Sequence, residues 1–136
     1  MTLQHFVQAQ APQLGDIEQE LARGYKVSHW MWYVFPQLVG LGKSATARRY
    51  ALASAAEARE YLAHPVLGPR LRRHTELVLR SSRSVDAIFG FPDNLKFHSC
   101  MTLFDHASPG DVFARALAQH FAGECDQSTL RLLAKD

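Results

Sequence analysis

The feature that most restricts the fold of this chain is a recurring pattern of a helix-capping residue, an apolar stripe at helical spacing, and a glycine or proline stop. Ser54 followed by Glu57 is a capping box, which satisfies free backbone amides where a helix starts. Pro65 suits a first helical position, because its missing amide hydrogen has no helical partner there. The following residues place an apolar stripe at i, i+4, i+7 and i+11, namely Leu67, Leu71, His74 and Val78. This segment therefore predicts a long helix.

The same pattern recurs along the rest of the chain. Further stripes occupy 97–104 and 112–121, and helix starts are expected at Thr2, Asp16, Ser84, Asp93, Ser108 and Asp126. No Asn-Gly or Asp-Gly hairpin signal lies between alternating apolar runs, and no linker is long enough to divide the chain. We therefore expect residues 1–136 to form a single all-α domain, a compact bundle of about six to eight short and medium helices without coiled-coil packing.

Composition narrows the class of protein. The 136 residues are 47% hydrophobic and carry a net charge of +2, which argues against disorder and against a dedicated nucleic-acid binder. We interpret the arginines between 65 and 83 as a solvated helix face. The two cysteines form no CxxC pair, and no apolar run approaches the ~20 residues that a membrane span needs. A cytoplasmic location is the expectation.

An aromatic run interrupts the helical punctuation between Trp30 and Phe35. Periodicity does not separate a buried strand from a buried helix over so short a run. Ser28 is a plausible N-cap, so a helix of roughly one or two turns is favoured. The run could belong to the core, line a pocket for a flat ligand, or form an interface, and the sequence leaves these three alternatives open.

The loop that follows resembles the end of a phosphate-binding P-loop, with Gly40, Gly42, Lys43 and Ser44. A true P-loop needs a glycine where this chain has Gln37, and it needs a parallel sheet behind it. We instead expect Ser44 to cap a helix that runs through residue 52. Free amides at such a helix start attract anions, so the loop is predicted either to form one wall of an anion-accepting pocket or to be a simple turn.

Nucleophilic and metal chemistry have little support in the sequence. Cys100 shares an apolar stripe with Phe97 and Met101, which predicts a buried and unreactive thiol. His98 is only two residues away and therefore points elsewhere on a helix. The seven histidines form no HExxH motif and no cluster with metal-ligand spacing. Neither a structural metal nor a cofactor is expected.

Several motifs together resemble a bacterial family, domain of unknown function 1810, whose members are sometimes labelled calpastatin. The matching residues are Phe6-Val7, Ala9-Gln10, Ser28–Trp32, Phe35–Leu38, Gly40–Gly42, Ser44, Tyr61-Leu62, His64–Gly68, Ile88–Gly90, Lys96, Ser99, Met101–Phe104, Phe121, Gly123, Asp126 and Thr129-Leu130. The resemblance implies a compact all-α fold and no established activity. Calpastatin is a long disordered inhibitor, which this composition excludes. The chain has Ser99-Cys100 where the family pattern has two serines, which weakens any nucleophilic role for Cys100.

A fainter similarity connects the chain to the NADAR proteins, which are thought to process NAD-derived or ADP-ribose compounds. It rests on the segment from His5 to Gln10 and on the region from Arg115 to Leu133. If this similarity holds, it implies a ligand of the nucleotide or ADP-ribose type.

Two functional hypotheses of different class follow. The first is a domain that binds a small anionic or nucleotide-like ligand, in which lysines neutralise the anion and tryptophans stack a ring. Its candidate lining is His29, Trp30, Trp32, Gln37, Gly40, Gly42, Lys43, Ser44, Lys96, Ser99 and Thr102. The second is a regulatory module that uses the aromatic segment to bind a protein partner. No catalytic residue is assigned, and the sequence leaves open whether the protein is an enzyme.

Overall fold

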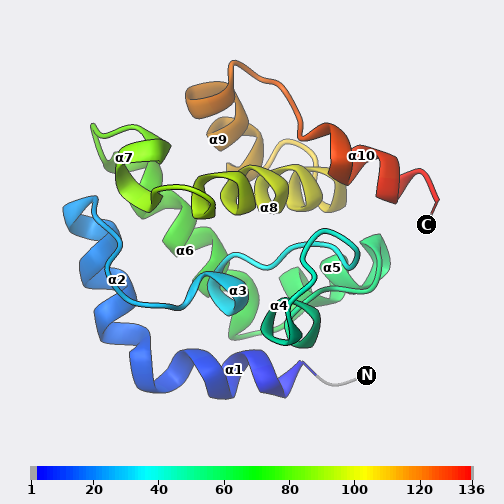
Figure 1. Cartoon of the computed structure of the whole chain (residues 1–136), viewed down its shortest axis with the longest axis horizontal. Coiled ribbons are helices and arrows are strands. Elements are labelled where there is room, and N and C mark those ends of the chain that lie inside the picture. Colours follow the sequence, from blue (N-terminus) through cyan, green and yellow to red (C-terminus); the bar gives the residue numbers. More distant parts are fainter. Residues whose placement is uncertain (1–2, 136) are drawn as a thin grey trace.

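The computed structural model describes residues 3–135, and every regular element among them is helical (Figure 1). The predicted all-α class is confirmed. The elements, in chain order, are α1 Gln4–Gln10, the 3₁₀ turn η1 Ala11–Gln13, α2 Leu14–Arg23, α3 Met31–Val34, α4 Ala45–Arg49, α5 Ala55–Ala63, α6 Leu67–Arg80, α7 Val85–Phe89, α8 Asp93–Ala107, α9 Val112–Phe121 and α10 Gln127–Leu133.

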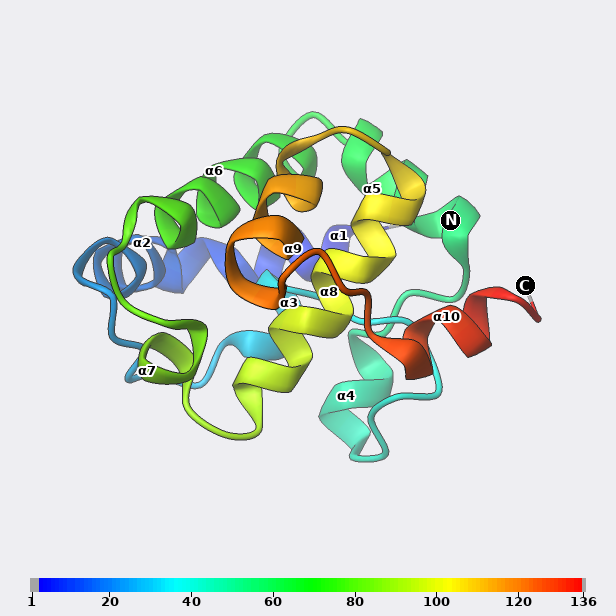
Figure 2. The ribbon, with the colours of Figure 1, turned by 90° about the horizontal axis from the view of Figure 1, so that it is seen from above.

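Helix α8 lies across the middle of the molecule and packs against α5, α7, α9 and α10 (Figures 1 and 2). Its expected apolar stripe is buried, including Phe97, Cys100 and Phe104. Neighbours on several sides also bury Leu103 and Thr102, which lie off that stripe. A helix enclosed in this way buries more than one face, so its sequence is less amphipathic than that of a surface helix.

The remaining long helices complete the core around α8. Helix α6 packs against α2, α5 and α9, and in Figure 1 α1 follows the lower edge while α2 rises along the left edge. The predicted stripe of α6 faces inward, with Leu67, Leu71, His74 and Val78 all buried. Periodicity therefore identified the buried face of this helix correctly.

Local capping chemistry determines several helix boundaries as predicted. The side-chain oxygens of Ser44, Ser54, Ser84 and Asp126 each accept the backbone amide three residues ahead, which satisfies a free donor at the helix start. Gly24 ends α2 with a φ of 77°, a left-handed conformation that glycine adopts without strain.

Two expected helix starts are wrong. Asp16 lies inside the first turn of α2, since α1, η1 and α2 follow one another without a gap. Pro65 lies in the turn before α6, because the ring nitrogen Nδ1 of His64 accepts the amides of Val66 and Leu67 and thereby caps that helix.

Two further starts are displaced. The Ser108 hydroxyl donates to Asp111 instead of capping a helix, and Asp111 is the N-cap of α9. Ser28 donates to Glu20, so Trp30 takes the N-cap position of the one-turn helix α3. The expected cap at Thr2 lies outside the described residues.

The helix after Ser44 is shorter than expected. It ends at Arg49 because the chain must leave it for Leu52 to reach Leu38. The amide of Val39 donates to the Leu52 carbonyl at 2.8 Å, and the Leu52 amide donates to the Gln37 carbonyl at 2.9 Å. This isolated parallel bridge is the one β-type pairing among residues 3–135.

Candidate functional site

The aromatic run turns its first tryptophan inward. Trp30 has no exposed surface, and its indole Nε1 donates to Glu20 at 3.0 Å. Phe35 is equally buried and meets Phe97 edge-on, with ring centroids 5.1 Å apart. As a candidate ligand-lining residue Trp30 is therefore corrected, because it belongs to the core.

Glu20 organises the segment that leads into this run. Its carboxylate accepts the amides of Val27 and Ser28 at 2.8 and 3.0 Å and the Ser28 hydroxyl at 2.7 Å, besides the Trp30 indole. Burial alone would raise the pKa of this carboxyl, but these hydrogen bonds outweigh it and lower the pKa to about 2. The charged form of Glu20 thus holds residues 27–30 against α2.

A chain of charged side chains begins on the outer side of the same segment. The Lys26 Nζ lies 2.9 Å from Asp93 Oδ2, and the Lys96 Nζ lies 3.3 Å from Asp93 Oδ1. The Lys26 side chain is only 8% exposed, and the Lys96 side chain is 23% exposed. Because one carboxylate is shared by two ammonium groups, this trio carries a net positive charge.

Each lysine of this trio lies over a tryptophan. Lys26 Nζ is 5.1 Å from the centroid of the buried Trp30 ring, and Lys96 Nζ is 4.9 Å from that of Trp32. Trp32, unlike Trp30, is only partly buried. The outer lysine and the outer tryptophan therefore form the solvent-facing end of the network. We call Lys26, Trp32, Asp93 and Lys96 the aromatic–lysine site.

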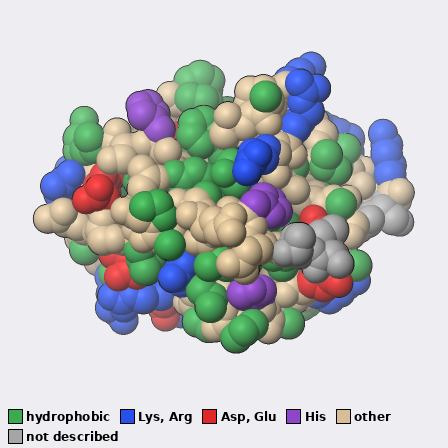
Figure 3. Space-filling view, turned by 90° about the horizontal axis from the view of Figure 1, so that it is seen from below, with side chains coloured by type: hydrophobic (Ala, Val, Ile, Leu, Met, Phe, Trp, Pro, Cys, Tyr) green, Lys and Arg blue, Asp and Glu red, His purple; other side chains and the backbone are tan. Residues whose placement is uncertain are grey.

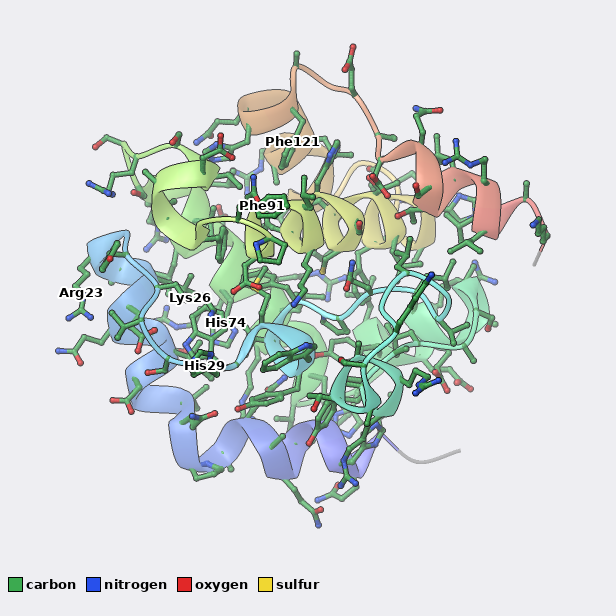
Figure 4. The ribbon with its side chains drawn as sticks, in the orientation of Figure 1. Arg23, Lys26, His29, His74, Phe91 and Phe121 are labelled. Atoms are coloured by element: carbon green, nitrogen blue, oxygen red, sulfur yellow. The ribbon has the colours of Figure 1, made fainter. Side chains whose placement is uncertain are left out.

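Exposed apolar side chains lie on the chain segments that carry this site. All five large hydrophobic residues that remain exposed among residues 3–135 fall on segments 25–39 and 91–95: Tyr25, Val27, Val39, Phe91 and Leu95. The two segments are joined at Lys26, whose amide donates to Ile88 just before Phe91. Figure 4 shows Lys26, His29 and Phe91 beside these segments, and Phe91 is 81% exposed.

Ser99 and Thr102 are corrected as ligand-lining candidates. Both hydroxyls are buried, and they bind α10 to α8. Ser99 donates to Asp126 at 3.2 Å, while Thr102 accepts the Asp126 amide at 2.8 Å and donates to the His98 carbonyl. With these partners the two side chains serve the packing of α10.

The glycine-rich loop contributes none of the four residues of the aromatic–lysine site. Gln37 is half-buried, Lys43 and His29 are exposed, and Ser44 caps α4. Gly42 is required by packing, since a Cβ there would lie 2.5 Å from the Ala47 Cβ. Gly40 lines a cavity of about 520 Å³ that α10 closes on the other side, whereas Gly42, Lys43 and Ser44 are not among its lining residues.

The structure also shows a hollow that the sequence did not suggest. A cavity of about 650 Å³ lies between residues 81–86 and residues 119–121. Its wall is rich in serine and includes Arg83 and His120. No motif marks it, because it forms only where the loop before α7 meets the end of α9.

The basic stretch between residues 65 and 83 makes local ion pairs. Arg72 pairs with Asp111 at 2.9 Å, and Arg73 pairs with Glu18 at 3.1 Å. In the face shown in Figure 3, the visible Lys and Arg side chains form separate groups with acidic, histidine and apolar side chains between them. That face presents no continuous basic stripe among the described residues, the feature that nucleic-acid binding would require.

Reactive and metal-ligating groups are sparse in the described part of the chain. Cys100 is fully buried as predicted, and burial raises the pKa of its thiol well above the ordinary value. Residues 3–135 contain no group of three or more His, Cys, Asp or Glu side chains placed to hold a metal ion. None of the helices in this range is both long and apolar enough to cross a bilayer.

These features define an all-helical domain with a lysine–tryptophan network on its surface. The chain belongs to the family described as protein of unknown function (DUF1810), whose sequence profile matches residues 1–133. It is similar to a solved structure, the conserved hypothetical protein Rv1873 from Mycobacterium tuberculosis, with 48% identity and a TM-score of 0.95. That match covers 97% of this chain and 96% of the other. A comparison with curated proteins finds no relative. The similarity to NADAR proteins stays a prediction.

Proposed function

We propose that this protein binds a small ligand that combines an anionic group with a flat ring, and that it does so at the aromatic–lysine site. The observation that carries the proposal is the Lys96 ammonium, which lies 4.9 Å over the partly exposed ring of Trp32 while sharing Asp93 with Lys26. This arrangement supplies a cation and an aromatic surface side by side.

The network is organised before any ligand arrives. Lys26 is almost fully buried, so its charge is held close to Asp93, and Asp93 in turn holds Lys96. An incoming phosphate or carboxylate would meet a positioned ammonium group, which lowers the entropic cost of binding. A ring beside that anion would stack on Trp32. A nucleotide or an ADP-ribose-like compound has both parts.

The exposed apolar residues favour a second candidate function, the binding of a protein partner. Phe91, Leu95, Tyr25 and Val27 are exposed and lie within two residues of Lys26, Asp93 or Lys96 in the chain, and exposed apolar patches mark interaction surfaces. In that case Lys96 would contact an acidic residue of the partner at the rim. With a photoreactive amino acid in place of Tyr25, the protein would then crosslink to its partner in cells. Replacing Phe91 and Leu95 by aspartate would abolish this crosslink while leaving the binding of small ligands unchanged.

The test of the ligand proposal is a thermal-shift and calorimetric titration with inorganic phosphate, AMP and ADP-ribose. A ligand present at 100 times its dissociation constant stabilises the folded state by about 2.7 kcal/mol. We expect AMP or ADP-ribose to raise the melting temperature more than phosphate does, because only the former two stack on Trp32.

Matched lysine variants locate the site. Lys96→Met keeps the aliphatic stem over Trp32 and removes the charge, so it should abolish the shift without unfolding the protein. Lys43→Met removes an exposed lysine from the glycine-rich loop and serves as the control. A shift that survives Lys96→Met and disappears in Lys43→Met would move the anion site to the loop, and no shift with any probe would contradict the proposal.

A further inference from the structure

A second hollow lies between the glycine-rich loop and α10, which run side by side in Figures 1 and 2. The loop contributes Gly40 and Leu41, and the last turns of the chain contribute Ser128, Arg131, Leu132, Ala134 and Lys135. Its volume of about 520 Å³ falls in the range of roughly 300–1,000 Å³ that small-molecule pockets occupy.

The wall from α10 has two kinds of side chain on one face. Ser128, Arg131 and Leu132 follow at i, i+3 and i+4, the spacing that places residues on the same side of a helix, and Lys135 lies in the turn just after the helix ends. The Arg131 Nη2 donates to the Ser128 hydroxyl at 3.1 Å. Two cations therefore face the cavity on either side of one leucine.

These cations have no acidic partner within residues 3–135. Every ion pair in that range joins other residues, and the one side-chain hydrogen bond of Arg131 goes to the neutral Ser128. By contrast, Arg72 and Arg73 of α6 and Arg115 of α9 each form an ion pair with an acidic side chain. Within that range no carboxylate pairs with Arg131 or Lys135, and both side chains line the cavity.

The wall opposite α10 consists of Gly40 and Leu41, neither of which has a polar side chain. Gly40 has a φ of 102°, and a Cβ added there would lie 3.4 Å from both methyl groups of Leu132. The loop backbone thus lies within van der Waals reach of Leu132, and the half-buried Leu41 packs against the core. An occupant would meet leucine side chains on one part of its surface and cations on another.

From this geometry we infer that the cavity binds a small amphipathic monoanion, such as a medium-chain carboxylate. Its carboxylate pairs with Arg131 and Lys135, and its apolar part packs against Leu41 and Leu132. The site is separate from the aromatic–lysine site, since none of the four residues of that site lines the cavity.

Titration with octanoate, followed by two-dimensional NMR and calorimetry, tests the inference. Octanoate should shift the amide signals of residues 40–41 and 128–135, and the neutral analogue octanamide should bind roughly tenfold more weakly or not at all. The double variant Arg131→Gln/Lys135→Gln should lose at least that factor. Arg80→Gln, at the exposed end of α6, is the matched control and should bind octanoate normally.

A variant that fills the cavity makes the test independent of charge. Ser128→Trp places a large ring in the hollow from an exposed position, so the fold should survive while binding is lost. Equal affinity for octanoate and octanamide, unchanged binding in either variant, or signal changes confined to other regions would each overturn the inference. Lys96→Met should leave octanoate binding intact, which separates this site from the proposed function.

Discussion

Trp30 and Trp32 are two residues apart in one short segment, yet the fold uses them in opposite ways. Trp30 is fully buried, and its indole hydrogen bonds to a carboxylate that is itself saturated with donors. Trp32 is partly exposed and lies under the ammonium of Lys96. An aromatic side chain therefore stabilises the fold where its surroundings are closed, and is free to meet a ligand where they are open.

The carboxylates near the two rings show the same contrast. The Glu20 carboxylate accepts four hydrogen bonds from Val27, Ser28 and Trp30. Its negative charge therefore stabilises the segment from residue 27 to residue 30. Asp93 pairs with both Lys26 and Lys96, so its single negative charge does not neutralise the two ammonium groups. The more exposed Lys96 can therefore pair with a further anion.

The largest expected effect comes from removing the inner ring. Trp30→Ala should destabilise the protein by about 3–5 kcal/mol, because it leaves a cavity in the core and removes one of the hydrogen bonds to the Glu20 carboxylate. Chemical denaturation monitored by circular dichroism measures the loss. A cost below about 1 kcal/mol would show that Trp30 is not the anchor of this segment.

The next prediction concerns His74, a residue of α6 whose side chain is buried in the protein core. Burial lowers its pKa to about 4, against the opposing effect of Glu18, whose carboxylate lies 3.3 Å away, while the nearby Arg70 and Arg73 lower it further. The unfolded chain takes up a proton near pH 6.5 and the folded chain does not. Stability should therefore be complete above pH 6.5 and fall by about 3 kcal/mol as the pH approaches 4.

The matched variant for this pH effect is His74→Gln, which has no titrating ring. Its stability should be lower at pH 7, but nearly all of the decline that the His74 ring causes between pH 6.5 and 4 should be absent. Denaturant titrations at a series of pH values give both curves. If the two slopes agree over that window, the decline originates in other groups.

A smaller loss is expected when the charge of Glu20 is removed. Glu20→Gln keeps the shape but replaces charged hydrogen bonds with neutral ones, at a cost of about 2 kcal/mol at pH 7. Since the folded pKa is about 2 and the ordinary value 4.5, the contribution is present above pH 4.5 and disappears as the pH falls towards 2. The variant and the original protein should thus converge in stability at low pH, and a constant difference would refute the charge argument.

The smallest effect on stability belongs to the outer ring. Trp32→Ala should cost less than about 1 kcal/mol while removing the binding of AMP or ADP-ribose. Because the chain has two tryptophans, Trp30→Phe and Trp32→Phe each leave a single tryptophan, which can be excited selectively. Iodide should quench the fluorescence of Trp32 and leave that of Trp30 unchanged. Comparable quenching of both would remove the distinction between the two rings.

The aromatic–lysine site shows how far sequence reasoning reached. Trp32 and Lys96 were expected to contribute a ring and a charge to one site, and the structure brings them together. Asp93 was expected only to open a helix, and Lys26 was not among the candidate site residues. Their ion pair joins segments far apart in the chain, and no local pattern marks such a contact.

Local sequence patterns are sufficient to predict the helical character of the chain and many of its helix boundaries. Capping residues such as Ser54 and Asp126, and stripes such as that of α6, depend on neighbours within a few residues. The tertiary structure decided which polar groups serve the core and which remain available. Ser28 binds Glu20 instead of capping α3, and Ser99 binds Asp126 instead of facing a ligand. These choices depend on partners that only the packed helices bring within hydrogen-bond distance.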